Sequence, residues 1–251
     1  MLKNLRYLLT SFSLVITHFV VLGLFLAGVI PNVSSRDPFI YSLLLTVVGG
    51  IALYISYFSF YVFRKTKGVQ MLVISSGFFV LGASYLLFTL SGPDFNFLGI
   101  FKAVFSLAEN YGVFFGSAMM LFLLVPLDNF KERIYSHRLE VFLSIVVIYS
   151  FTLFIVILKP EYVATLQGAS SVFLGSACIF LLLIFIFLFH QYREVGSRFL
   201  INLFTGVILF TTSIIISFFD DRNNLFWWYG QATVLVSFLI ILVGFILAQW
   251  E

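Results

Sequence analysis

Long apolar runs recur along the whole chain, and they constrain its fold more than any other feature. A helix needs about 18–20 largely apolar residues to cross the hydrocarbon core of a bilayer. Eight runs meet this length approximately, at residues 8–30, 39–63, 69–90, 98–125, 139–158, 171–190, 199–218 and 226–248. The sequence therefore predicts an all-α, polytopic integral membrane bundle of eight transmembrane helices, forming a single domain over residues 1–251.

Composition excludes a water-soluble protein. Of the 251 residues, 61% are hydrophobic and 10% are charged, whereas soluble domains carry about 25% charged residues. Proline removes a backbone donor and breaks helices. The five prolines all lie between the apolar runs, at Pro31, Pro38, Pro93, Pro126 and Pro160. The position of the prolines between the runs favours helices over the short alternating strands of a membrane β-barrel.

The distribution of basic residues predicts the orientation. If the N-terminus is cytoplasmic, ten of the 14 Lys and Arg residues fall on the inner side, which follows the positive-inside rule. These ten are Lys3, Arg6, Arg64, Lys65, Lys67, Lys131, Arg133, Arg138, Arg193 and Arg198. Eight spans then return the C-terminus to the cytoplasm as well. We expect a bacterial or archaeal plasma membrane.

The two ends of the chain carry their own expectations. The run at residues 8–30 is longer than the 7–15 residues of a signal-peptide core, so we expect a retained first span. Phe226–Tyr229 is aromatic and precedes the last span, which is typical of an interfacial anchor. The sequence stops at Gln249–Glu251 without an effector domain, so signalling is expected to need a partner or a longer protein.

The fourth run contains the clearest candidate for a functional centre. Ser106, Glu109 and Asn110 lie within an otherwise apolar segment. A charged residue near the bilayer centre costs at least about 2.5–3.5 kcal/mol, and such residues are functional hypotheses by default. The interpretation is that Glu109 binds a ligand or exchanges a proton; the structural alternative is a protonated Glu that joins two helices. Gly112 and Gly116 form a small-xxx-small pattern that predicts close helix packing.

His18 in the first run is the second candidate. It lies about ten residues from the inner end of its run and Glu109 about eleven from the outer end, so both are expected near mid-depth. A Glu109–His18 pair would hold a proton or a polar ligand, because histidine titrates near neutrality. The alternative is a neutral His18 that bonds a hydroxyl or a carbonyl of a neighbouring helix.

Other site chemistries lack their residues. The three histidines and the single Cys178 predict no metal cluster, and no cofactor is expected. No nucleophile elbow, phosphate loop or HExxH motif occurs, so an enzyme is not expected. The basic residues are dispersed and explained by topology, which argues against nucleic-acid binding.

Two functions fit this pattern. An interior rich in aromatic residues, with 34 phenylalanines, favours a membrane-embedded sensor or regulatory module that binds a small apolar or amphiphilic ligand or senses the state of the bilayer. Its expected partners are the lipid bilayer, that ligand, and a cytoplasmic or membrane partner protein. The alternative is a small-solute or proton-coupled transporter with Glu109 as its protonatable site. Loosely similar connections after the second and sixth runs, which hint at a four-plus-four repeat, favour the transporter.

Overall fold

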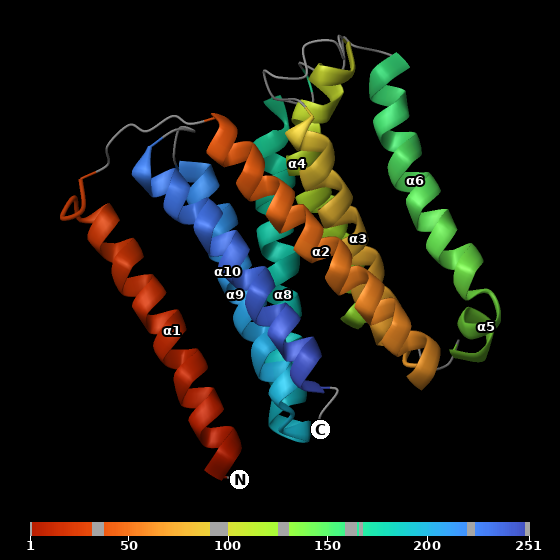
Figure 1. Ribbon diagram of the computed structural model, residues 1–251, viewed down its shortest axis with the longest axis horizontal. Coiled ribbons are helices and arrows are strands. Elements are labelled where there is room, and N and C mark those ends of the chain that lie inside the picture. Colours follow the sequence, from red (N-terminus) through yellow and green to blue (C-terminus); the bar gives the residue numbers. More distant parts are fainter. Residues whose placement is uncertain are drawn as a thin grey trace. The chain divides into compact units, whose positions relative to one another are not determined.

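A computed structural model describes residues 2–31, 38–90, 100–124, 131–158, 165, 168–219 and 224–248. The elements of this described part are helices (Figure 1). Their bounds are α1 Leu2–Leu26, α2 Pro38–Thr66, α3 Val69–Thr89, α4 Ile100–Leu121, η2 Phe122–Leu124, α5 Lys131–Ser136, α6 Arg138–Leu158, α8 Ser170–Val195, α9 Arg198–Phe219 and α10 Leu225–Ala248.

Seven described helices are long and apolar enough to cross a membrane: α1, α2, α3, α4, α8, α9 and α10. The chain is therefore a multi-pass integral membrane protein of the helical type. The remaining predicted span, residues 139–158, coincides with α6, but the apolar segment found in the described part of α6 is the shorter Glu140–Phe151. The described part of the chain thus contains seven candidate spans, where the sequence predicted eight.

The helices form two compact units. One unit comprises residues 38–180 and contains α2 to α6 with the start of α8. The other comprises residues 1–37 and 181–251 and contains α1, the rest of α8, α9 and α10.

In the unit of residues 38–180, α3 is the central helix. Of its most apolar window 67% is buried, and it packs against both α2 and α4. Small residues allow these close approaches. A Cβ atom built on Gly82 of α3 would lie 2.9 Å from the Gly49 carbonyl oxygen of α2. Further along the same pair, the Ser56 and Ser75 hydroxyls each donate to the other residue's carbonyl oxygen, both at 2.8 Å.

In the other unit α9 has the central place, with 83% of its window buried. It packs along α10, where a Cβ on Gly206 would lie 2.3 Å from the Ile241 side chain. The Ser237 hydroxyl of α10 donates to the Gly206 carbonyl oxygen at 2.8 Å. Helices α9 and α10 are therefore closely packed, and α1 lies against α9 of this pair.

The connections after α2 and α8 share one backbone feature, a residue with positive φ. Each contains one residue in the left-handed region, Lys67 with φ 57° and Gly196 with φ 67°. The Lys67 and Gly196 amides donate to Phe63 and Tyr192 carbonyl oxygens, each at 2.8 Å, which satisfies carbonyls at a helix end. These short turns make α2–α3 and α8–α9 antiparallel neighbours in the chain.

Candidate functional site

His18 is the one buried residue in the membrane-spanning window of α1. Only 6% of that window is buried, and His18 is 7% exposed. The apolar side chains of the same helix are instead exposed, as Leu9, Ile16 and Val20 illustrate. In a bilayer the exposed apolar side chains contact lipid, and the ionisable residue of a span faces the protein interior. His18 is thus the polar contact of this window with the rest of the unit, beside the ring contacts of Phe25 with Phe226 and Tyr229.

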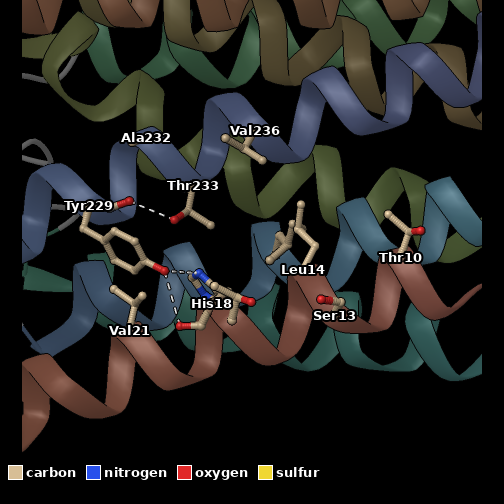
Figure 2. Close-up of a pocket in the computed structure, with 11 residues that line it drawn as sticks. Thr10, Ser13, Leu14, His18, Val21, Tyr229, Ala232, Thr233 and Val236 are labelled. Carbon is tan, nitrogen blue, oxygen red and sulfur yellow. Dashed lines mark hydrogen bonds between the residues drawn. The ribbon is translucent and has the colours of Figure 1, made fainter.

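Both ring nitrogens of His18 are hydrogen-bonded within the unit of residues 1–37 and 181–251, and Figure 2 shows the bond between Nδ1 and Tyr229. Nε2 lies 2.8 Å from Thr212 Oγ1 of α9, and Nδ1 lies 2.6 Å from the Tyr229 hydroxyl of α10. The Tyr229 ring also stacks on the imidazole, with centroids 5.3 Å apart and planes at 15°. His18 therefore joins three helices at one point.

The donors of this cluster can be assigned by counting protons. The Thr212 hydroxyl donates its single proton to the Leu209 carbonyl oxygen at 2.8 Å, so its oxygen accepts from His18 Nε2–H. Nδ1 then carries no proton in neutral imidazole and accepts from the Tyr229 hydroxyl. The resulting chain runs in one direction, from Tyr229 through His18 and Thr212 to the Leu209 carbonyl. With Tyr229 as the donor to Nδ1, this arrangement corresponds to the neutral Nε2–H form of His18.

A partly open groove of about 520 Å³ lies beside this cluster (Figure 2). Its walls come from α1 and α10, with one residue from α9, and they mix hydroxyl groups with aliphatic side chains. The lining residues are Thr10, Ser13, Leu14, Thr17, His18, Val21, Leu209, Tyr229, Ala232, Thr233 and Val236. Its volume falls in the range of small-molecule sites, about 300–1,000 Å³.

Two hydroxyl groups of the groove are unsatisfied within the described part of the chain. Ser13 and Thr17 are exposed on α1, and neither hydroxyl makes a hydrogen bond to another described residue. By contrast, the Thr233 hydroxyl donates to the Tyr229 carbonyl oxygen at 2.8 Å. A hydroxyl without a partner in an apolar medium costs free energy. The groove therefore offers hydrogen bonds to a polar group that enters it.

Glu109 lies in the other unit and has a different environment. Its Oε2 accepts a hydrogen bond from the Tyr41 hydroxyl of α2 at 3.2 Å, and the buried Tyr85 hydroxyl of α3 interacts with it electrostatically. Tyr41 is the fourth residue of α2, and Tyr85 lies four residues before the end of α3. Glu109 is thus about one helical turn inside the ends of its neighbours. The expectation that Glu109 lies at mid-depth stays a prediction.

The other predicted site residues on α4 lie as follows. Asn110 is half-buried, and the side chain of Ser106 lies outside those that the structure describes. Gly112 and Gly116 face α3: a Cβ on Gly112 would lie 2.0 Å from Ser84 Cβ, and one on Gly116 would lie 3.0 Å from the Gly77 carbonyl oxygen.

The predicted Glu109–His18 pair joins residues of different units. The hydrogen bonds given above join Glu109 to Tyr41 in one unit and His18 to Thr212 and Tyr229 in the other. The pairing stays a prediction.

Sequence reasoning missed Tyr229 and Thr212. Tyr229 was expected to be an interfacial anchor with its aromatic neighbours, but it turns inward to His18, and Trp227 beside it is 4% exposed. Thr212 is one of several Ser and Thr residues within the apolar runs, and its residue type alone does not distinguish it. The helical spacing of Thr205, Leu209 and Thr212 places them on one face of α9, which was the available signal.

A second cavity lies in the unit of residues 38–180. It measures about 240 Å³ and lies between α3, α4, η2, α5 and α6, lined by Leu72, Met119, Phe122 and Ile145 among others. Its single polar residue, Ser76, donates its hydroxyl proton to the Leu72 carbonyl oxygen at 2.9 Å. The cavity offers no polar atom for recognition.

Among the residues that the structure describes, no group of three or more His, Cys, Asp or Glu side chains is placed to hold a metal ion. No protein-family model, curated protein or solved structure matches the chain. The functional argument therefore rests on the chemistry of the groove and of the His18 cluster.

Proposed function

We propose that the protein is a membrane-embedded sensor that binds a small amphiphilic molecule in the groove between α1, α9 and α10. The observation that carries the proposal is the groove beside His18, where hydroxyl groups and aliphatic side chains line one space of about 520 Å³. Such a lining suits a molecule with one polar end and an apolar body. The sensor assignment follows from the position of the groove against α1.

Helix α1 is suited to report occupancy. Its membrane-spanning window buries little of its surface, and the one buried residue of that window forms a wall of the groove. A ligand shifts a conformational equilibrium only by its differential affinity for the two states. A molecule in the groove contacts α1 directly, so its binding free energy acts on a helix that buries little of its surface. The altered position of α1 would be read by a cytoplasmic or membrane partner protein.

The finer topology belongs to the same proposal. We infer eight spans, with α6 as the fifth, both termini in the cytoplasm, and a bacterial or archaeal plasma membrane as the location. The support is the concentration of Lys and Arg on one side of the predicted spans, together with the helical α6 at residues 138–158.

The alternative function, transport with Glu109 as the protonatable site, has weaker support. The residues around Glu109 are tyrosines close to the ends of α2 and α3. Transporter sites are typically formed near the bilayer midplane by interrupted helices, whereas α2 and α4 are continuous there. Loss of solute uptake in Glu109→Gln proteoliposomes would reverse this preference.

The groove can be tested with a photoreactive dodecanol that carries a diazirine next to its hydroxyl group. In nanodiscs, we expect mass spectrometry to find the label concentrated on the α1 and α10 segments that line the groove. Ala232→Trp fills the groove and should remove most of this label. Leu239→Trp is the matched control, because Leu239 is exposed on the same helix but does not line the groove. Labelling spread evenly over lipid-facing residues, and unchanged in Ala232→Trp, would refute the site.

Reporting by α1 needs a separate measurement. Spin labels at Leu26 and Leu225, both exposed, mark the ends of α1 and α10 in a variant without Cys178. We expect dodecanol to change the distance between the labels in the wild-type groove and not in Ala232→Trp. A distance that stays the same while dodecanol is bound would refute the sensor and leave a binding site alone.

A further inference from the structure

We propose that the ligand of the groove is a single-chain carboxylic acid of the fatty-acid class, and that its binding moves a proton through Tyr229 to His18. The inference rests on the proposed function, because it names the ligand class and the chemistry of the same groove. Three features support it: the groove lining has no charged side chain, the residue that joins the three helices is a histidine, and the hydrogen bonds of His18 form one continuous chain.

The groove has no fixed charge in its lining. None of its lining residues is Asp, Glu, Lys or Arg, and its titratable members are His18 and Tyr229. Against His18, α9 presents Thr212, which does not titrate near neutrality, and α10 presents Tyr229. A permanently charged headgroup would therefore enter without a counter-charge, which is costly in an apolar medium. A carboxylic acid enters as a neutral molecule and becomes charged only if a neighbour takes its proton.

His18 can take up a proton, although joining Tyr229 to Thr212 does not require this ability. An Asn or Gln side chain could also accept from the Tyr229 hydroxyl and donate to the Thr212 hydroxyl. Imidazole differs because it takes up a proton near neutral pH. A carboxylic acid next to the Tyr229 hydroxyl can supply that proton through the 2.6 Å hydrogen bond between Tyr229 and Nδ1. An alcohol has no proton to give, so it leaves His18 neutral.

The transfer balances over two bonds. The carboxylic acid gives its proton to the Tyr229 oxygen as the Tyr229 hydroxyl proton passes to His18 Nδ1 over 2.6 Å. One carboxyl O–H bond and one phenol O–H bond break, and one phenol O–H bond and one Nδ1–H bond form. The products are a carboxylate, an unchanged Tyr229 hydroxyl that now donates to it, and an imidazolium. The hydroxyl groups of Ser13 and Thr17 are available to the carboxylate.

The hydrogen bonds of the cluster can accommodate the new proton. The Nε2–H bond to Thr212 is the same in both states, so the link between α1 and α9 persists. The hydrogen bond between Tyr229 and His18 reverses its direction, because the Tyr229 oxygen now accepts from Nδ1–H. Without a ligand, the reversed hydroxyl has the His18 carbonyl oxygen as its acceptor, 3.3 Å away. The contact that changes is thus the one between α1 and α10, the same pair of helices whose separation the sensor is expected to change.

The test is a nitrogen-15 NMR measurement of the His18 ring in phosphatidylcholine nanodiscs. The variant His137→Gln/His190→Gln removes the two other histidines, both of which are exposed, and leaves one assigned ring. At about pH 7.5 we expect the neutral Nε2–H form before ligand is added. Lauric acid should convert the ring to the imidazolium form. Dodecanol, of the same chain length, should bind without this conversion.

Tyr229→Phe removes the relay and separates proton transfer from binding. We expect lauric acid to displace the dodecanol photoprobe from this variant with an affinity reduced roughly tenfold or less, the value of one hydrogen bond. The His18 ring should nevertheless stay neutral. The comparison of lauric acid with dodecanol in the protein with Tyr229 intact does not depend on how well this variant folds.

The outcomes separate the two proposals. If lauric acid displaces the photoprobe while His18 stays neutral, the proton transfer is refuted and the groove remains a binding site. If imidazolium forms equally with dodecanol, the carboxylic acid is not the source of the proton and the ligand class is wrong. If neither compound displaces the photoprobe, the proposed function fails and this inference fails with it.

Discussion

Substituting Gly112 by alanine should separate α3 from α4. The added Cβ would lie 2.0 Å from Ser84 Cβ, whereas ordinary contact begins at 3.4 Å, so the two atoms must move apart by 3.4 − 2.0 = 1.4 Å. Each Cβ is fixed to its backbone, so rotamer changes do not relieve the clash and the helices themselves must shift. A gap of 0.5–1 Å already forfeits a quarter to a half of the dispersion energy of a contact.

The expected cost is at the upper end of the range for overpacking, about 3 kcal/mol. The shift also pulls Ser84 away from the Tyr149 hydroxyl, to which it is hydrogen-bonded. For a chain of this length, about 3 kcal/mol corresponds to a fall of roughly 6–12 °C in the midpoint of thermal unfolding. The midpoint can be measured in detergent with a thiol-reactive dye, because Cys178 is the single cysteine and is half-buried.

Two variants make the result specific. Gly50→Ala is the matched control, since nothing lies within 4 Å of its added Cβ, and helix propensity should leave its midpoint unchanged or raise it. Ser84→Gly removes the clashing atom, so the double variant with Gly112→Ala should recover part of the loss. If Gly112→Ala unfolds at the same temperature as Gly50→Ala, α3 and α4 are not in contact at Gly112 and the packing argument is wrong.

Three further predictions concern other contacts. Ser75→Ala removes an interhelical hydrogen bond and should cost about 0.6–1.7 kcal/mol in the same unfolding assay. Ser59→Ala removes a hydrogen bond within its own helix and should cost less. Equal losses of stability in the two variants would refute the interhelical role of Ser75. Tyr41→Phe removes the bond to the α4 carboxylate and should cost about 0.5–1.5 kcal/mol; an unchanged midpoint would contradict this. Membrane-impermeant thiol labelling of Glu132→Cys and Gly168→Cys, on opposite sides of α6, should reach them from opposite sides of the membrane; labelling from one side would refute eight spans.

The helices were predictable because their signals are local. The apolar runs and prolines place α2 and α3 close to their observed bounds, and Gly68 and Gly196 mark the short turns. The run length of 8–30 likewise predicted α1. These features depend on the composition of single segments, which the sequence states directly.

The site was predictable only in part, because partners on other helices are not encoded locally. The sequence indicated His18 as an ionisable residue within a membrane span, and one alternative was a bond to a hydroxyl of another helix. It did not indicate which hydroxyls, and Tyr229 was assigned to the membrane interface by its aromatic neighbours. Glu109 attracted more attention, but its depth depends on where α2 and α3 end beside it, and these are properties of the packed unit.

His18, the single buried residue in the membrane-spanning window of α1, also determines how far that helix can slide. A displacement of one turn, about 5.4 Å, would bring Leu14 or Leu22 close to the position of His18. Neither leucine side chain can bond Thr212 or Tyr229, so intermediate positions lose both bonds at once and gain nothing. The helix consequently has one preferred insertion depth despite its small packed area, and a change of bilayer thickness would have to break the same two bonds to move it.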